Sequence, residues 1–217
     1  MKRIVDLSLT LHHGMRGVEF APKYTVDDKG WNATTLSLYS HSGTHMDAPV
    51  HYNVSREGID SIPLEHCMGP AHIVDVTAID SKGLLTPAHV QYLQTKIKKG
   101  DGLIFKTGWS AFIDTPQYRE QAPGLSPELV EWCVLKGIRM LGIDTPSVSD
   151  VNNIPLLTRI HKILLAAGII IVEGLANLDA LEKEYVFFMA IPLKLKAMDG
   201  SPVRAFAIEN DAVWRWT

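Results

Sequence analysis

The chain has 217 residues, of which 46% are hydrophobic and 21% are charged, and its formal net charge is -3. This composition is typical of one globular domain and excludes a disordered or collagen-like chain. The small net charge gives no electrostatic footprint for nucleic acid or an anionic membrane, so we expect neither as a partner. The longest apolar run, Ile163 to Val172, is too short to span a bilayer, which needs about 20 residues.

The N-terminal segment and the cysteines predict a cytoplasmic protein. Asp6, Ser8 and Thr10 interrupt any apolar core of a signal peptide. Cys67 and Cys133 lie far apart and form no CxxC pair. Two free thiols in a reducing compartment are therefore expected.

Hydrophobic patterning predicts the elements in chain order. Alternating or β-branched apolar runs indicate strands at 4–9, 34–39, 73–76, 103–106, 139–143, 169–172, 185–195 and 203–208. Proline near a first turn and glycine after a last turn indicate helices at 86–97, 126–137 and 155–167. The run 169–172 is typical of a strand buried on both faces.

Helix and strand alternate in the second half of the chain, which predicts a parallel βαβ unit. The first half and the tail are rich in predicted strands. No linker or shift in composition divides the chain. We therefore predict one mixed α/β domain over residues 1–217, with a β-rich core and flanking helices.

One short segment carries four candidate functional side chains at odd positions, namely His41, His45, Asp47 and His51. Alternate side chains of an extended segment project to the same face. A straight strand would spread them over about 30 Å, so we expect bends, for which Gly43 and Pro49 are suited. Imidazole and carboxylate together are ligands for zinc, manganese, iron or nickel rather than for magnesium or calcium. The alternative, unrelated histidines near a turn, does not explain their common face.

The segment also matches the pattern HxGTHxDxPxH, by which the chain resembles the cyclase family of metal-dependent hydrolases. This family includes bacterial kynurenine formamidases and isatin hydrolases, and the resemblance extends from Asp6 to the C-terminal strands. It implies a swivelling β/β/α-like domain. It also implies that His41 and His45 are terminal ligands of one metal ion and that Asp47 bridges two. His51 corresponds to the catalytic acid–base residue.

By the same resemblance, His161 and Glu173 complete a second metal site, because formamidases of the family carry a histidine and a glutamate at this spacing. From the residues alone, a core histidine and a solvated strand end is the competing interpretation. Glu173 nevertheless ends a predicted buried strand, where α/β proteins place functional groups. A carboxylate here, in place of the amide of isatin-hydrolase-like members, implies two divalent ions per chain, with zinc expected and manganese as the alternative.

The resemblance implies a hydrolase that cleaves the carbon–nitrogen amide bond of a small aryl substrate such as N-formylkynurenine. Two divalent ions with two carboxylates keep a net positive charge, which lowers the pKa of bound water to about 7 and favours attack by hydroxide. An imidazole at position 51, with an unperturbed pKa of about 6.5, suits proton transfer. The alternatives are an isatin-hydrolase-like lactam or lactone hydrolase and a non-catalytic metal-binding protein. The net charge and the absence of cysteine ligands disfavour a nucleic-acid-binding zinc module.

Three further expectations concern the surroundings of the site. The tryptophan of the N-terminal loop in the family's formamidases is absent from residues 14–22, and Phe20 is the candidate apolar wall. The segment 144–147 is predicted to be a turn that begins at Asp144, with pocket lining as the alternative. The aromatic C-terminus, with Trp214 and Trp216, predicts a homodimer or higher homo-oligomer.

Overall fold

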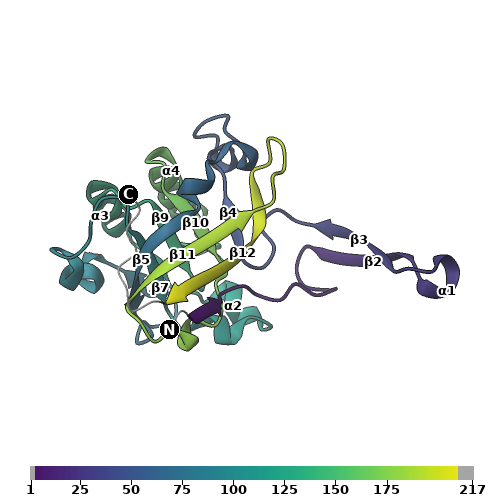
Figure 1. Cartoon of the computed structure of the whole chain (residues 1–217). Helices are drawn as coiled ribbons and strands as arrows, with labels where there is room; N and C mark the ends of the chain where they lie inside the picture. Colours follow the sequence, from purple (N-terminus) through teal and green to yellow (C-terminus); the bar gives the residue numbers. More distant parts are fainter. Residues whose placement is uncertain (1–2, 210–217) are drawn as a thin grey trace.

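A sheet that closes on itself forms the centre of the computed structural model, which describes residues 3–209 (Figure 1). Its order is β12-β11-β5-β7-β9-β10-β4, and β4 pairs back onto the first residues of β12, so that seven strands close a ring. β1 pairs with the end of β12 outside this ring. These strands are β1 (Arg3–Asp6), β4 (His45–Asp47), β5 (Met68–Asp75), β7 (Gly102–Lys106), β9 (Met140–Ile143), β10 (Ile170–Glu173), β11 (Tyr185–Pro192) and β12 (Gly200–Glu209).

The remaining strands form two small ladders, and the helices lie between strands. β2 (Val18–Tyr24) pairs with β3 (Ala33–Leu38), and β6 (Leu84–Leu85) pairs with β8 (Gly124–Leu125). The α-helices are α1 (Val26–Lys29), α2 (Pro116–Glu120), α3 (Pro127–Lys136) and α4 (Ile154–Ala166). Short 3₁₀ helices span Pro49–Tyr52, Ile59–Ser61, Leu64–His66, Pro87–Leu93, Trp109–Phe112 and Leu178–Ala180.

Two apolar cores lie on the two faces of the parallel strands β5, β7, β9 and β10. Ile104 packs in one core, and its neighbours Leu103 and Phe105 pack in the other, with α3 and α4. The same alternation puts Val172 in the first core and Ile171 in the second. Successive side chains of β10 point to opposite faces, and all four of its residues are buried. Burial on both faces is thus confirmed for the run that the sequence predicts at 169–172.

The parallel unit of β9, α4 and β10 confirms the predicted βαβ arrangement. The mixed α/β class with a β-rich core is also confirmed. The predicted α-helix at 86–97 is wrong, because a 3₁₀ helix spans only Pro87–Leu93. Its buried side chains, Val90 and Leu93, are three residues apart, a spacing that a helix with three residues per turn places on one face.

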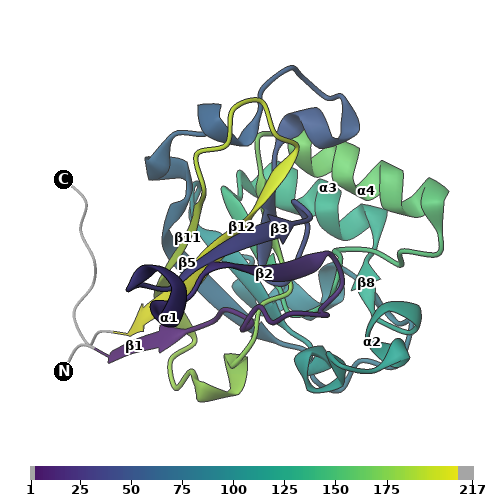
Figure 2. The same ribbon diagram turned by 90° about the vertical axis from the view of Figure 1, so that its right-hand side faces the viewer.

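The β2–β3 hairpin with α1 at its tip forms an arm that projects from the body of the molecule (Figures 1 and 2). The sequence predicts β3 as a half-buried strand, but its side chains are mostly exposed. Large apolar side chains on the arm are exposed by about half, including Trp31 at 56% and Leu36 at 57%. An arm of this kind lacks a core of its own and exposes apolar surface to solvent.

Both cysteines are free, as predicted, and both are buried. Among residues 3–209, no helix combines the length and the apolar character needed to cross a membrane. The cytoplasmic location predicted from the sequence stays a prediction. Trp214 and Trp216 lie outside the described residues.

Candidate metal centre

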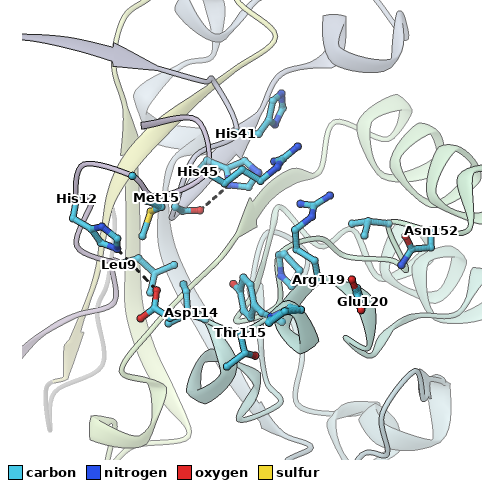
Figure 3. Close-up of a pocket in the computed structure, with 18 residues that line it drawn as sticks. Leu9, His12, Met15, His41, His45, Asp114, Thr115, Arg119, Glu120 and Asn152 are labelled. Atoms are coloured by element: carbon cyan, nitrogen blue, oxygen red, sulfur yellow. Dashed lines mark hydrogen bonds and ion pairs between the residues drawn. The ribbon is translucent and has the colours of Figure 1, made fainter. Parts of the chain in front are cut away.

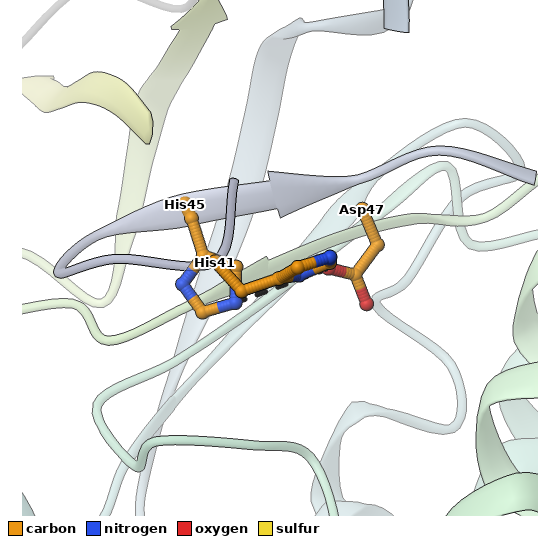
Figure 4. A group of neighbouring side chains, drawn as sticks. All are labelled: His41, His45 and Asp47. Atoms are coloured by element: carbon orange, nitrogen blue, oxygen red, sulfur yellow. Dashed lines mark ion pairs between the residues drawn. The ribbon is translucent and has the colours of Figure 1, made fainter. Parts of the chain in front are cut away.

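Strand β4 brings its functional residues to two other strands by direct cross-strand pairing. His45 lies opposite Glu173 of β10, and Asp47 lies opposite Gly200 of β12. His45 and Asp47 are two positions apart, so their side chains project from the same side of the strand (Figure 4). The closure of the ring therefore places residues from three distant parts of the sequence around one point.

His41 joins this group because the chain turns between residues 41 and 45, as predicted. Gly43 adopts the left-handed backbone conformation, with φ at +58°, which costs glycine little. The ring centres of His41 and His45 are 5.1 Å apart, and His41 Nδ1 lies 2.9 Å from Asp47 Oδ1. Gly200 is needed beside them, since a Cβ there would lie 2.9 Å from the His41 ring.

His161 reaches the same point from α4. It is buried within the apolar face of the helix, with Ile160 and Leu164 as buried neighbours. Its Nε2 atom lies 3.5 Å from Asp47 Oδ2 and 3.3 Å from Glu173 Oε1. The structure thus brings together all five residues predicted as ligands, including the pair that the sequence alone left open: His41, His45, Asp47, His161 and Glu173.

Two overlapping groups of these residues have the spacing of metal ligands. In each group, one ligand atom per residue lies within 4.8 Å of the others. The first group is His41, His45 and Asp47, and the second is Asp47, His161 and Glu173. Asp47 belongs to both groups, which is the position required of a carboxylate that bridges two ions.

The hydrogen bonds of the site fit a cation between the side chains. His45 Nδ1 donates to Gly43 O at 2.9 Å, and His161 Nδ1 donates to Leu157 O at 2.8 Å. A carbonyl oxygen only accepts, so in the neutral rings both Nε2 atoms carry a lone pair. These lone pairs face carboxylate oxygens at 3.1 to 3.5 Å. Proteins fix the metal-bound tautomer of histidine through this kind of backbone bond.

The surroundings of Asp47 provide a second test of whether the residues of the site fit a metal ion. Its side chain is 1% exposed, and neither carboxylate oxygen has a hydrogen-bond partner among the described residues, although imidazole nitrogens lie nearby. A buried carboxylate without compensation is strongly unfavourable. Glu173 differs, because its Oε1 accepts from Ser147 Oγ and from Val148 N. The residues present therefore fit divalent transition-metal ions, with Asp47 depending on them most.

At two residues of the site, neighbouring charged groups outweigh the effect of burial on the pKa. Burial alone would disfavour a charged His41, but the neighbouring Asp47 and Asp199 outweigh it and raise the pKa of His41 to about 9. Burial likewise opposes ionisation of Glu173, yet His161 and His45 hold the pKa of this carboxyl well below its usual value. The site thus keeps Glu173 in its anionic form, which is the form that a metal ion requires of a carboxylate ligand.

His51 lies beside this group but reaches no oxygen of Asp47 or Glu173. Its ring centre is 4.1 Å from that of His41, and its Nδ1 lies 3.6 Å from Asp199 Oδ2. Asp199 also lies 3.0 Å from His41 Nε2, so these three residues form a third group with ligand spacing. The pKa of His51 is lowered, chiefly because burial disfavours the imidazolium.

A pocket of about 510 Å³ opens beside His41 and His45 (Figure 3). Met15 of the N-terminal loop and Tyr118 of α2 are among its apolar and aromatic walls. Phe20, the expected wall, lies on β2 and does not line the pocket, because the chain turns away from the site into the arm. Met15 and Tyr118 therefore form the kind of wall that was expected of Phe20, and the expectation for Phe20 is wrong.

The segment that begins at Asp144 lines the pocket, which is the second of the two roles considered for it. Asp144 Oδ1 accepts from Thr107 N at 2.9 Å and Asp144 Oδ2 accepts from Gly108 N at 2.9 Å. Asp144 thus fixes the loop after β7 rather than a turn of its own. Pro146, two residues later, lines the pocket.

Sequence reasoning missed three residues of the site. Asp199 contacts two histidines, Tyr52 stacks on the His161 ring at 4.6 Å between ring centres, and Arg119 lines the pocket. The Asp-Gly step at 199–200 indicates a turn before the last strand, but nothing in the sequence connects it with the histidines. Tyr52 directly follows His51, which is the one local signal for it.

Comparison with known proteins gives a consistent result. The model of the Cyclase family, described as "Putative cyclase", matches residues 5–150. The kynurenine formamidase of Bordetella petrii is 30% identical over 182 residues, which are 82% of this chain and 81% of that protein. Isatin hydrolase A from Labrenzia aggregata, solved with benzyl benzoate, superposes with a TM-score of 0.86 and 27% identity, over 95% of this chain and 93% of that chain.

A third similar structure is described as a "predicted metal-dependent hydrolase" from Bacillus stearothermophilus. It has a TM-score of 0.79 and 26% identity and covers 97% of this chain and 100% of that chain. Fold, site and comparisons together define a hydrolytic enzyme. The family match spans well over half of the chain, and the chain belongs to the Cyclase family. His161 and Glu173 lie beyond the matched residues, so their place in the site comes from the structure.

Proposed function

We propose that the protein is a binuclear metal-dependent amide hydrolase. The observation that carries the proposal is the bridging position of Asp47, a buried carboxylate shared by two ligand groups and without hydrogen-bond partners of its own. His41 and His45 would hold one ion, and His161 and Glu173 the other. Divalent ions held there would supply the Lewis acidity that activates water and polarises a carbonyl group. Mixed imidazole and carboxylate ligands favour zinc, with manganese as the alternative.

His51 is the proposed proton carrier. Asp199, at 3.6 Å from His51 Nδ1, orients the ring, and the other ring nitrogen is left for a water molecule or the leaving nitrogen. A neutral imidazole can accept a proton from water and return it to the amine that leaves. Burial of His51 lowers its pKa and so favours this neutral form. Three neighbouring groups fix where this ring lies: His41, Tyr52 and Asp199.

The proposed reaction is the hydrolysis of a small aryl formamide such as N-formylkynurenine, with release of formate. The kynurenine formamidases among the similar proteins support this substrate class. A lactam or lactone is the second candidate, supported by the similar isatin hydrolase structures. Glu173 favours the first candidate, because its carboxylate completes the second ligand group.

The test is hydrolysis by metal-loaded protein of matched compounds: N-formylkynurenine, formanilide, isatin and a benzolactone. We expect the formamides to be hydrolysed with higher kcat/KM than isatin, and elemental analysis to find two ions per chain. Preference for isatin would select the lactam hydrolase instead. Hydrolysis of none of these compounds by a protein with two bound ions would contradict the proposal.

We further propose that the enzyme is a homodimer and that the β2–β3 arm contributes to its interface. The exposed side chains of Trp31, Leu36 and Val26 on the arm support this proposal, because apolar and aromatic surface of this kind is typical of interfaces. Light scattering should give twice the mass of one chain. The double substitution of Trp31→Ser and Leu36→Ser should shift this mass toward the monomer, whereas an unchanged dimer would exclude the arm.

A further inference from the structure

Two arginines line the pocket beside the metal centre. Arg16 belongs to the N-terminal loop, and Arg119 belongs to α2. Figure 3 shows the side chain of Arg119 extending toward His41 and His45. Within residues 3–209, neither guanidinium lies within ion-pair distance of a carboxylate, in contrast to surface arginines such as Arg159, which pairs with Glu131 at 3.2 Å.

The loop that carries Arg16 is fixed to the histidine segment. Ser42 Oγ lies 3.2 Å from the carbonyl oxygens of both Arg16 and Gly17, to which it donates. The guanidinium carbon of Arg16 lies 5.2 Å from the ring centre of Tyr39, and this ring lies 5.4 Å from that of His41. Arg16 is thus separated from a proposed metal ligand by one aromatic ring.

Arg119 is held independently of that loop. The neighbouring Tyr118 is buried with Trp109, whose indole Nε1 donates to Tyr118 O at 3.1 Å. Burial, followed by the nearby charge of Arg16, lowers the pKa of Arg119, and Glu173 partly opposes this. Arg119 therefore interacts electrostatically with Arg16 and with Glu173 of the proposed metal centre.

Arg119 is half-buried and Arg16 is exposed. Two like charges in one pocket without counterions repel each other, and Arg119 also loses part of its hydration. The acidic residues of the pocket do not relieve this repulsion. Asp114 and Glu120 are exposed, and Asp114 faces His12 at 3.9 Å on the far side of the pocket from Arg119. A bound anion would relieve the repulsion between the two arginines. A carboxylate suits this role, because its two oxygens match the planar fork of a guanidinium.

We propose that Arg16 and Arg119 bind a carboxylate of the substrate, so that the enzyme acts on amides whose amine part carries a carboxylate. This inference rests on the proposed function, since the scissile carbonyl is placed at the metal centre. One end of the substrate is then held at the histidines and the other end at the arginines. Neutral aryl amides and lactams fill only the first of these positions and are poorer substrates.

The experiment compares each carboxylate substrate with its neutral carboxamide. Suitable pairs are 2- and 3-formamidobenzoate with the corresponding formamidobenzamides, and N-formylkynurenine with its α-carboxamide. The measured quantity is the ratio of kcat/KM between the members of a pair. We expect ratios well above one for wild type, reduced about 10- to 100-fold by Arg119→Gln or Arg16→Gln, mainly through KM, because charged hydrogen bonds contribute this much. Arg159→Gln removes the same charge outside the pocket and should keep the wild-type ratio.

A binding measurement separates this inference from the proposed function. Calorimetry of the metal-loaded protein should show that 3-aminobenzoate binds more tightly than 3-aminobenzamide, and that this preference weakens in both arginine variants but not in Arg159→Gln. That result supports carboxylate recognition even if no amide is hydrolysed, in which case only the proposed function fails. Equal losses of kcat on charged and neutral substrates, or an unchanged preference in the variants, would overturn the inference.

Discussion

Two buried aspartates face histidines at different places in this fold, and their surroundings differ. Asp101, before β7, has every oxygen paired, since Oδ1 accepts from Tyr185 OH at 3.3 Å and Oδ2 accepts from Lys98 N at 2.9 Å. His72 Nε2 also lies 3.3 Å from Asp101 Oδ2. Asp47 is at least as buried, at 1% against 4% exposure. Among the described residues no backbone amide or hydroxyl donates to it, although His41 Nδ1 lies 2.9 Å from its Oδ1.

This difference distinguishes a carboxylate that stabilises the fold from a carboxylate that binds a metal ion. Polar groups that stabilise a fold are satisfied by hydrogen bonds within it. A buried carboxylate that no backbone amide or hydroxyl reaches, and that imidazole nitrogens surround, is typical of a metal ligand. Substitutions at the two aspartates should therefore affect different quantities, metal content and activity in one case and the free energy of unfolding in the other.

The largest effect is expected for Asp47→Ala. Loss of the shared ligand should remove both ions, and activity should fall by about 10³-fold or more, because metal ions contribute several kcal/mol of transition-state stabilisation. Elemental analysis and kcat/KM are the measurements, with Asp101→Ala as the matched control that keeps both ions. Retention of one ion in Asp47→Ala would make Asp47 an ordinary ligand rather than a bridge.

The next effect concerns the two histidines on either side of Asp47. His51→Asn should keep both ions and lower kcat about 10²- to 10⁴-fold, the range for a positioned acid–base group. His45→Asn should lose metal and activity together, because the asparagine amide is a poor substitute for imidazole as a ligand. If His51→Asn loses metal, then His51 belongs to the ligand set, together with Asp199.

A smaller effect is expected for Asp101→Ala. This change leaves the amide of Lys98 and the side chains of His72 and Tyr185 without their acceptor, which should cost about 1–3 kcal/mol of unfolding free energy. In a domain of this size the melting temperature should fall by about 2–4 °C per kcal/mol. Urea unfolding of metal-loaded wild type and variant measures the difference. Activity at temperatures below the transition should stay near the wild-type value.

The smallest effect is a pH dependence of the stabilisation that the Asp101 carboxylate provides. Burial alone would raise the pKa of Asp101, but hydrogen bonds from His72 and Lys98 outweigh it and hold this pKa below the ordinary value of 3.8. Stabilisation by Asp101 should thus be fully present above that ordinary pKa and be lost as the pH falls through the lower, folded-state pKa. Unfolding of wild type and Asp101→Asn, both without metal, should therefore converge in acid. A constant difference down to pH 2 would contradict this assignment.

Much of the fold and of the site follows from local patterns in the sequence. The segment of His41 to Asp47 has its proposed ligands at odd positions, and α3 and α4 have proline at the first turn. The pairing of β4 with both β10 and β12 is not visible in this way, because a strand of three residues has no periodicity to read. Sequence reasoning also missed Asp199 and Arg119, because only tertiary contacts relate these two residues to the histidines.

The three-residue length of β4 has a consequence for the order of folding. This strand closes the ring by pairing with Glu173 and Gly200, which lie far along the chain. Contacts of such high sequence separation carry a large loop-closure entropy and tend to form late. The late pairing of β4 is thus also the one that brings the proposed ligands together. We therefore expect the proposed ligand set to be complete only when the ring has closed.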